Sequence, residues 1–186
     1  MHIPIAQPSL GNEENEAVLA VLASGMIAQG PVTAAFEEEF AAYCGIPHAV
    51  AVSNGTTALH AALLATGVGP GDEVVVPAFT FFATASSVSM CGAVPVFADV
   101  DAVTATIDPA DIITKVTSKT KAVIGVHLYG QPCDAGAIRD ICDDKGLVFI
   151  EDAAQAHGAE YRGKRAGALG DLACFSFYAT KNLATG

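Results

Sequence analysis

The sequence is poor in basic residues and contains no long apolar run. Lysine and arginine together number 9 against 20 acidic residues, which gives a formal net charge of -11. Such a field repels a nucleic-acid duplex or an anionic membrane surface, so we expect neither as a partner. No stretch of about 18 apolar residues could span a bilayer. The first residues also lack the basic start and apolar stretch of a signal peptide, and we expect a cytoplasmic protein.

The cysteines do not follow a metal-binding pattern. They are five in number and widely spaced, and no cysteine or histidine pair has the spacing of a zinc site. Cys133 is predicted to lie in a loop. The other four have apolar neighbours and are predicted to be reduced core residues: Cys44, Cys91, Cys142 and Cys174. No metal ion is therefore expected.

The composition is that of a packed globular protein. Hydrophobic residues make up 52% and charged residues 16%, which excludes a disordered chain. A length of 186 residues fits one domain. We therefore expect residues 1–186 to belong to a single domain.

Short apolar runs alternate with helical segments from residue 48 onward. Continuous Val, Ile and Phe runs are typical of strands that are buried on both faces of a mostly parallel sheet, which predicts an α/β fold. Two amphipathic helices are expected before them, the second with Thr33 as its N-cap. The predicted strands are 48–52, 73–77, 94–100, 121–127, 147–152 and 171–177, and the predicted helices are 12–23, 33–43, 56–66, 83–90, 109–115 and 134–145.

The first candidate binding motif runs from Ser53 to Leu59, between a predicted strand and a predicted helix. In an open parallel sheet, ligands bind at the carboxyl ends of the strands. Gly55 permits a tight turn there, and the free amides at the start of a helix form an anion site. A simple helix cap by Ser53 or Asn54 explains the same residues equally well. The motif is neither a GxGxxG nor a Walker loop.

The second candidate is Asp152, at the end of a buried predicted strand. An unpaired carboxylate is costly in such a place. A cationic partner would stabilise it, and the protonated ring nitrogen of a pyridine cofactor is one such partner. Gln155 lies in the same loop and could form a hydrogen bond with a ring substituent. The ordinary alternative for Asp152 is an acidic helix cap.

The third candidate is Lys181, which follows the aromatic strand 171–177. Lysine forms Schiff bases with carbonyl compounds once it can lose its proton. Ser176 lies nearby in the sequence and could donate to a phosphate. Taken alone, a lysine after a strand is usually a solvated surface charge.

The fourth candidate is the segment 77–84. One of its aromatic rings could stack on a flat cofactor, although core packing explains most of its aromatic residues.

In this order and spacing, the segments resemble the DegT/StrS family of sugar aminotransferases, a branch of the aspartate aminotransferase (fold type I) superfamily. The resemblance covers nearly the whole chain and is most specific in EDAAQAHGA (151–159) and SFYATKNL (176–183). It implies a seven-stranded-type, mostly parallel sheet flanked by helices, in a large domain that binds pyridoxal 5'-phosphate. Residues 1–186 would be the N-terminal part of that domain, ending after the lysine, without the family's small C-terminal domain.

The resemblance also implies chemical roles. Lys181 would hold the cofactor as a Schiff base and carry the proton during catalysis, and Asp152 would pair with the pyridine nitrogen. Gln155 would bond the ring's 3-oxygen, and His157 and Tyr178 receive no role.

The remaining roles implied by the resemblance concern binding of the cofactor. The ring would stack on Phe81, and the phosphate would be held by Gly55, Thr56 and Ser176.

The lysine at 181 favours amino transfer, because the related sugar dehydratases carry histidine there. The resemblance implies a homodimer in amino-sugar biosynthesis that moves an amino group from an amino acid, commonly L-glutamate, to a nucleotide-linked keto-sugar. One alternative is a catalytically inactive, cofactor-binding or regulatory protein of the same family. A nicotinamide-dependent dehydrogenase is disfavoured because no GxGxxG follows the first strand.

Overall fold

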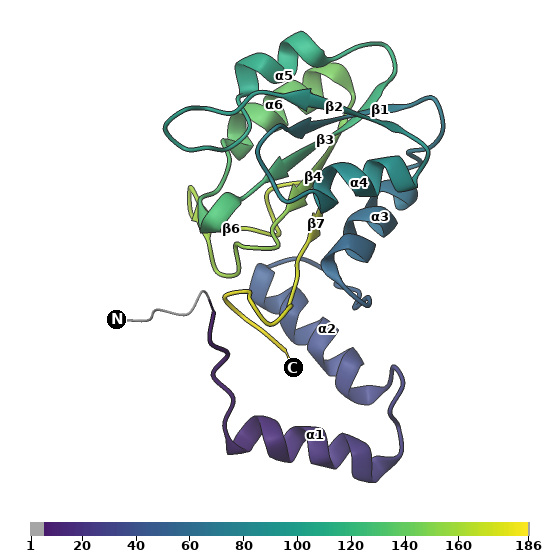
Figure 1. The fold of residues 1–186 in the computed structure, drawn as a ribbon, viewed down its shortest axis with the longest axis vertical. Coiled ribbons are helices and arrows are strands. Elements are labelled where there is room, and N and C mark those ends of the chain that lie inside the picture. Colours follow the sequence, from purple (N-terminus) through teal and green to yellow (C-terminus); the bar gives the residue numbers. More distant parts are fainter. Residues whose placement is uncertain (1–5, 186) are drawn as a thin grey trace.

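The computed structural model describes residues 6–185, and a parallel five-stranded sheet forms its centre (Figure 1). The strand order is β2-β1-β3-β4-β7, and every neighbouring pair is parallel. Four strands match the predicted apolar runs closely, while β7 is shorter than the predicted strand 171–177. The strands are β1 (Glu73–Pro77), β2 (Val94–Ala98), β3 (Thr120–Val126), β4 (Val148–Asp152) and β7 (Leu172–Cys174).

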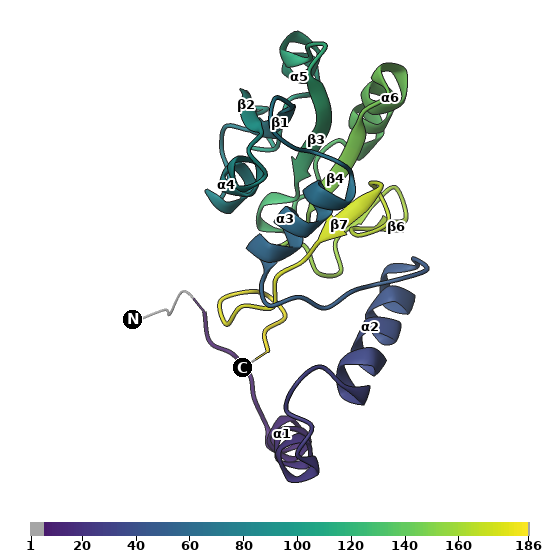
Figure 2. The same cartoon turned by 90° about the vertical axis from the view of Figure 1, so that its right-hand side faces the viewer.

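Helices cover both faces of the sheet, with α3 and α4 on one face and α5 and α6 on the other (Figure 2). Because side chains alternate along a strand, β1 serves both layers. Val74 and Val76 pack with Leu63 of α3, whereas Val75 packs with Ile112 of α5. The predicted α/β class is confirmed. These helices are α3 (Gly55–Ala65), α4 (Ala83–Met90), α5 (Pro109–Lys115) and α6 (Ala135–Lys145), with a 3₁₀ turn η1 (Leu128–Gly130) after β3.

The parallel arrangement gathers the predicted site residues at one edge of the sheet. In the ladder between β4 and β7, Asp152 pairs with Cys174, and Ala153 N donates to Cys174 O at 2.8 Å. The chain therefore leaves both strands side by side. The loop that carries Gln155 and the segment that carries Lys181 start from neighbouring points.

The predicted strand at 48–52 is wrong. The segment is not part of the sheet, and Val50 and Val52 are 77% and 42% exposed. Ala51 N donates at 2.7 Å to the Glu37 side chain instead of to a neighbouring strand. A strand needs a partner for its backbone groups, and none of residues 6–185 supplies one to this segment.

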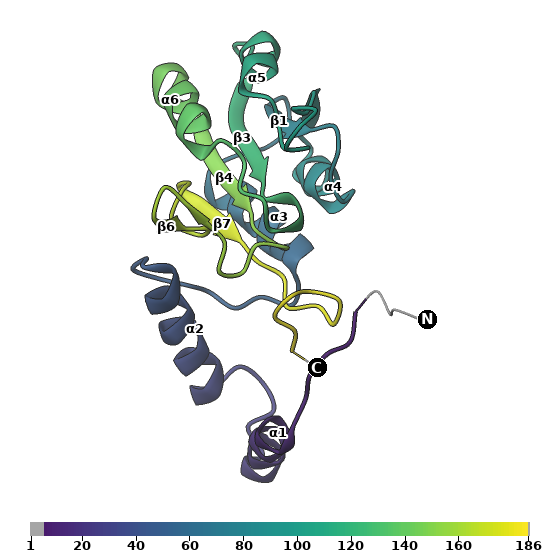
Figure 3. The same cartoon turned by 90° about the vertical axis from the view of Figure 1, so that its left-hand side faces the viewer.

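Two further helices, α1 (Asn12–Ser24) and α2 (Pro31–Cys44), lie away from the sheet layers (Figure 3). Gly30, not Thr33, is the N-cap of α2, because Pro31 has the fixed φ and the missing N–H that suit the first helical position. Rings join α2 to the segment after β7: the Phe40 and Phe175 centroids are 4.9 Å apart. By contrast, α1 buries none of its residues.

The remaining features concern turns and cysteines. A small hairpin of β5 (Glu160–Tyr161) and β6 (Lys164–Arg165) was not predicted. Both of its turn residues, Arg162 and Gly163, have positive φ, as a type I′ turn requires. All five cysteines are free and buried, including the loop residue Cys133. No helix within residues 6–185 is long and apolar enough to cross a membrane.

Candidate active site

Asp152 lies at the carboxyl end of β4 and is 6% exposed. Its Oδ2 accepts a hydrogen bond from Thr84 Oγ1 at 2.7 Å, and its Oδ1 accepts one from Ala154 N at 3.2 Å. Burial raises the pKa of Asp152, and these two bonds and the nearby charge of Lys181 only partly oppose that effect. Among residues 6–185, no side chain forms an ion pair with it. A cation that entered this space would stabilise the carboxylate.

Lys181 lies in the segment that leaves β7, and a backbone bond from Lys181 N to Tyr178 O at 2.8 Å holds its turn. Its positive charge opposes the rise that burial causes in the pKa of Asp152, and it adds to the lowering that burial causes in the pKa of His157. The lysine therefore acts electrostatically on the buried carboxyl at the end of β4. The two residues predicted to carry the chemistry thus lie at or beyond the carboxyl ends of two neighbouring parallel strands, β4 and β7.

His157, which the sequence analysis left without a role, fastens the lysine segment to the loop after β4. Its Nδ1 lies 2.8 Å from Asn182 Oδ1, and Asn182 Nδ2 donates to His157 O at 3.2 Å. Its ring contacts the rings of Phe175 and Phe177. Burial is the main cause of a lowered pKa of His157, and its Nε2 has no hydrogen-bond partner within the described chain. These contacts tie His157 to Asn182, the residue after Lys181.

Gly55 opens α3 directly against the segment after β7. A Cβ built on Gly55 would lie 2.9 Å from Ser176 Cβ and 3.3 Å from Phe175 O, so only glycine allows this approach. Asn54 caps the helix by accepting from Thr57 N at 2.8 Å. The capping alternative is therefore correct for Asn54. The backbone amides of Gly55 and Thr56 have no acceptor inside the helix, so they could donate to an anion beside Ser176.

Gln155 contacts the 3₁₀ turn that follows β3. Its Oε1 accepts from Tyr129 N at 2.8 Å, which leaves the amide nitrogen free to donate to another group. Tyr129 has φ 53° and ψ 27°, an uncommon conformation for a residue with a side chain. Strained backbone of this kind is concentrated at functional sites. The contact orients Gln155 as a hydrogen-bond donor.

Phe81 lies on the surface beyond β1. The residue is 58% exposed, and its ring centroid lies 4.6 Å from that of Phe82. Its link to the other candidates runs through the backbone, because Thr84 N donates to Phe81 O at 3.1 Å and the Thr84 hydroxyl holds Asp152. The structure therefore places Phe81 on an exposed turn that is connected to Asp152 through Thr84.

Sequence reasoning missed three buried polar residues at or next to Asp152. Thr84 donates to its carboxylate, and His127 and Glu151 form a buried pair on the adjoining backbone. The sequence does contain one signal that could have found these residues: they are polar residues in or beside apolar segments. Such residues are buried only when they are bonded, so each one indicates an unseen partner.

Comparison with known proteins is consistent with this geometry. A family model described as the DegT/DnrJ/EryC1/StrS aminotransferase family matches residues 8–186. The GDP-perosamine synthase of Caulobacter vibrioides is 49% identical over 185 residues, which cover 99% of this chain and 50% of that protein.

Solved structures agree in fold. DesV of S. venezuelae matches with a TM-score of 0.92 and 47% identity, over 94% of this chain and 47% of that one. The PLP form of Spr1654 from Streptococcus pneumoniae matches with a TM-score of 0.96 and 34% identity, over 99% and 51% of the two chains. The chain thus spans about half the length of the relatives that it matches.

Proposed function

The chain belongs to the DegT/DnrJ/EryC1/StrS aminotransferase family, and from this premise we propose that it forms the cofactor-binding part of a pyridoxal-phosphate-dependent sugar aminotransferase. The observation that carries the proposal is the buried Asp152 carboxyl, which has no ion-pair partner among the described residues and lies within the electrostatic reach of Lys181. Residues 1–186 would then be the N-terminal part of one cofactor-binding domain.

The residues present fit the cofactor at both of its ends. A pyridinium nitrogen is the cation that the Asp152 carboxyl lacks, and a phosphate is the anion that suits the start of α3. The close approach of Gly55 to Ser176 leaves backbone amides and a hydroxyl as donors at that point. When bound, pyridoxal phosphate supplies an aldehyde that accepts an amino group and a ring that accepts electrons.

The chain's own groups divide the remaining work. Lys181 Nζ would anchor the cofactor and then carry a proton to and from the reacting carbon. Asp152 would keep the ring nitrogen protonated, since its ionised form gains from that charge. Gln155 would donate through its amide nitrogen to the ring's 3-oxygen, because Tyr129 N already occupies its oxygen.

Binding and orientation of the cofactor would fall to two further groups. The exposed ring of Phe81 would stack on the pyridine face. The amides and hydroxyl of Gly55, Thr56 and Ser176 would hold the phosphate and so fix the position of the ring above Asp152.

The substrates we propose are L-glutamate as amino donor and a nucleotide-linked keto-sugar as acceptor. A relative named GDP-perosamine synthase and another named dTDP-3-amino-3,4,6-trideoxy-alpha-D-glucose transaminase support this class of acceptor. We also propose that the complete protein is a cytoplasmic homodimer. The formal net charge of -11 favours solubility of the protein.

The test is to load the purified protein with pyridoxal phosphate and add L-glutamate. The visible absorption of the bound aldehyde form should move toward the near ultraviolet as the cofactor takes up the amino group. Borohydride added before glutamate should fix the cofactor covalently on Lys181, as measured by the mass of the tryptic peptide. Lys181→Ala should lose both signals, while Lys119→Ala, an exposed lysine elsewhere, should keep them.

Two other outcomes would change the conclusion. An adduct on Lys181 without any spectral change on adding glutamate, and without product from a keto-sugar, would indicate a cofactor-binding protein that is not an enzyme. An adduct distributed over exposed lysines, or none at all, would overturn the proposal.

A further inference from the structure

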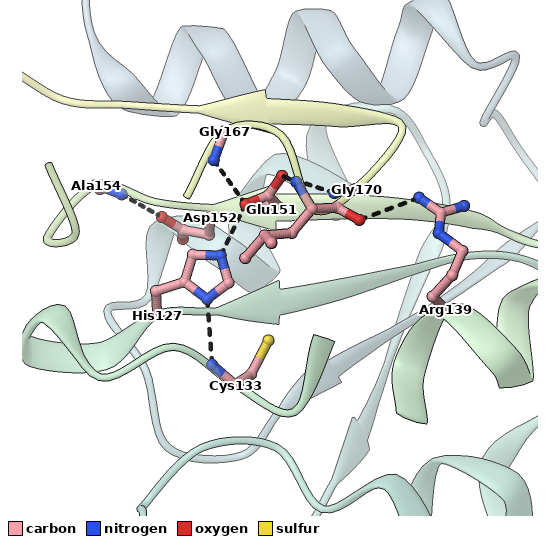
Figure 4. Close-up of polar contacts among 9 residues, drawn as sticks. His127, Cys133, Arg139, Glu151, Asp152, Ala154, Gly167 and Gly170 are labelled. Carbon is pink, nitrogen blue, oxygen red and sulfur yellow. Dashed lines mark hydrogen bonds and ion pairs between the residues drawn. The ribbon is translucent and has the colours of Figure 1, made fainter. Parts of the chain in front are cut away.

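The strongest polar network outside the proposed site surrounds Glu151, the residue before Asp152. Both the Glu151 and the His127 side chains are fully buried, at 0% exposure. Figure 4 shows the Glu151 carboxylate between the imidazole of His127 and the turn that contains Gly167 and Gly170. Nothing in the proposed chemistry uses this carboxylate, so its burial needs another explanation.

Four donors converge on the Glu151 carboxylate. Its Oε2 accepts from Gly167 N at 2.8 Å, and its Oε1 accepts from Leu169 N at 2.8 Å and Gly170 N at 2.7 Å. His127 Nε2 lies 2.9 Å from Oε2. These bonds outweigh burial and lower the pKa of Glu151, so the group is a carboxylate. An ionised acceptor with this many donors holds all of them strongly.

The other ring nitrogen of His127 determines its protonation. Cys133 N donates to His127 Nδ1 at 3.2 Å, so Nδ1 carries a lone pair and Nε2 carries the proton. The imidazole is therefore neutral and donates to Glu151. The backbone amide of His127 donates to Asp152 O at 3.1 Å, so the same histidine also contacts the residue that faces the site.

The turn that Glu151 holds leads directly into β7. Gly170 fits against β4 only because it lacks a side chain: a Cβ there would lie 2.7 Å from Phe149 O and 3.1 Å from Glu151 Cγ. Asp171 N then donates to Phe149 O at 2.8 Å, and β7 begins at the next residue. The position of everything after β7 therefore depends on how this turn sits on β4.

We propose that Glu151 is a positioning residue: by binding the turn 167–170 it sets β7, and with it Ser176 and Lys181, at the correct place relative to Asp152. This inference rests on the proposed function for the roles of those three residues. Glu151 is part of β4, and its side chain lies on the face opposite to that of Asp152. It touches no reacting group and acts only through the turn.

The experiment compares Glu151→Gln with a control of similar instability. Glutamine keeps the size but brings an NH₂ group among four donors, so at least one donor loses its acceptor. Ile112→Ala removes packing from α5, at a fully buried position that takes no part in the hydrogen bonds between Glu151 and the turn. Each variant is loaded with pyridoxal phosphate at a temperature where circular dichroism and urea titration show it to be folded. Borohydride then transfers hydride to the cofactor carbon bonded to Lys181 Nζ, and the adduct is measured by mass.

We expect Glu151→Gln to give at least a tenfold lower yield of the Lys181 adduct than Ile112→Ala at equal folded fraction. Glu151→Asp, which keeps the charge but shortens the reach, should give an intermediate yield and serves as the test variant if the glutamine variant does not fold. Amide exchange at Gly167, Leu169 and Gly170 should accelerate in the Glu151 variants and not in Ile112→Ala.

Failure of this inference is distinct from failure of the proposed function. A wild-type protein that forms the adduct, together with Glu151 variants whose adduct yield equals that of Ile112→Ala, would overturn the positioning role alone. A wild-type protein that forms no adduct overturns the proposed function, and this inference with it.

Discussion

Glu151 and Asp152 are consecutive buried carboxyl groups on opposite faces of β4, and their surroundings are opposite in kind. Glu151 receives four donors, and their bonds lower its pKa. Asp152 receives two, and burial raises its pKa. Burial is common to both, so the number of donors and not burial alone decides which group is stable as an anion.

The difference separates a structural group from one that is ready to bind. A carboxylate whose lone pairs all accept hydrogen bonds from the protein stabilises the groups that donate to it. It has no free acceptor site for a ligand. A buried carboxyl without enough donors costs stability until a cation arrives. Features that cost stability are expected at functional sites, and the buried carboxyl of Asp152, with only two hydrogen-bond donors, is such a feature.

The largest effect on the free energy of unfolding should follow from removing the charge of Glu151, the carboxylate with four donors. Glu151→Gln should lower the free energy of unfolding by about 3–5 kcal/mol, because buried donors lose an ionised acceptor. Urea titration of the cofactor-free protein measures the change. Glu16→Gln, on the exposed surface of α1, should change stability by less than about 0.5 kcal/mol. Equal, small effects at both positions would remove the contrast between the two carboxyls.

A smaller loss should follow from making Asp152 still poorer in donors. Thr84→Val keeps the shape of a fully buried side chain but removes the hydroxyl that donates to Asp152 Oδ2. We expect a cost of about 1–3 kcal/mol at neutral pH. Thr114 donates to the exposed carboxyl of Asp111, so Thr114→Val is the matched control and should have little effect. A harmless Thr84→Val would show that the bond contributes nothing to holding the charge.

The smallest effect should have the opposite sign. Asp152→Asn should raise the stability of the cofactor-free protein at neutral pH by about 1 kcal/mol, because a neutral amide keeps similar hydrogen bonds without a buried charge. The same replacement should weaken binding of pyridoxal phosphate. A loss of stability at every pH would mean that the carboxyl is already satisfied.

The pH dependence gives the same comparison without mutation. The folded-state pKa of Asp152 is raised, so its cost begins as pH rises above the unfolded value of about 3.9 and is complete above the folded pKa. The gain from Asp152→Asn should therefore vanish in acid. The pKa of Glu151 is lowered, so its contribution is fully present above about 4.3 and is lost as pH falls through the folded value. Urea titrations of wild type and Asp152→Asn between acid and neutral pH would separate the two signs.

The fold could be predicted wherever apolar periodicity and a pairing partner agree. The runs at 73–77 and 121–127 became central strands because both faces are covered by helices. The run at 48–52 is also apolar and contains valine, yet it is not a strand. Strand pairing needs a second segment, and the sequence of the first segment alone does not show whether one is available. Thr33 was misassigned as a cap because the geometry of Pro31 determines where α2 begins.

The site was predictable only to the extent that single motifs carry it. Asp152 ends one strand and Lys181 follows another, each in a specific motif, and the parallel topology brings the ends of these strands to one edge of the sheet. The partners of the two carboxyls could not be read in the same way: Thr84 and Asp152 are 68 positions apart, and His127 and Glu151 are 24 apart. Their contacts depend on the order of strands in the sheet, which local sequence patterns do not specify.

The isolation of α1 has a practical consequence for any measurement of stability. A helix of 13 residues that buries none of them is held mainly by its own hydrogen bonds, and such a helix is marginal in water. Its amides should exchange with solvent through local fraying, while those of β3 should wait for cooperative opening of the sheet. Far-ultraviolet ellipticity will therefore begin to decline before the rings of Phe175 and Phe177 separate from α2, and a single melting temperature will describe only the second event.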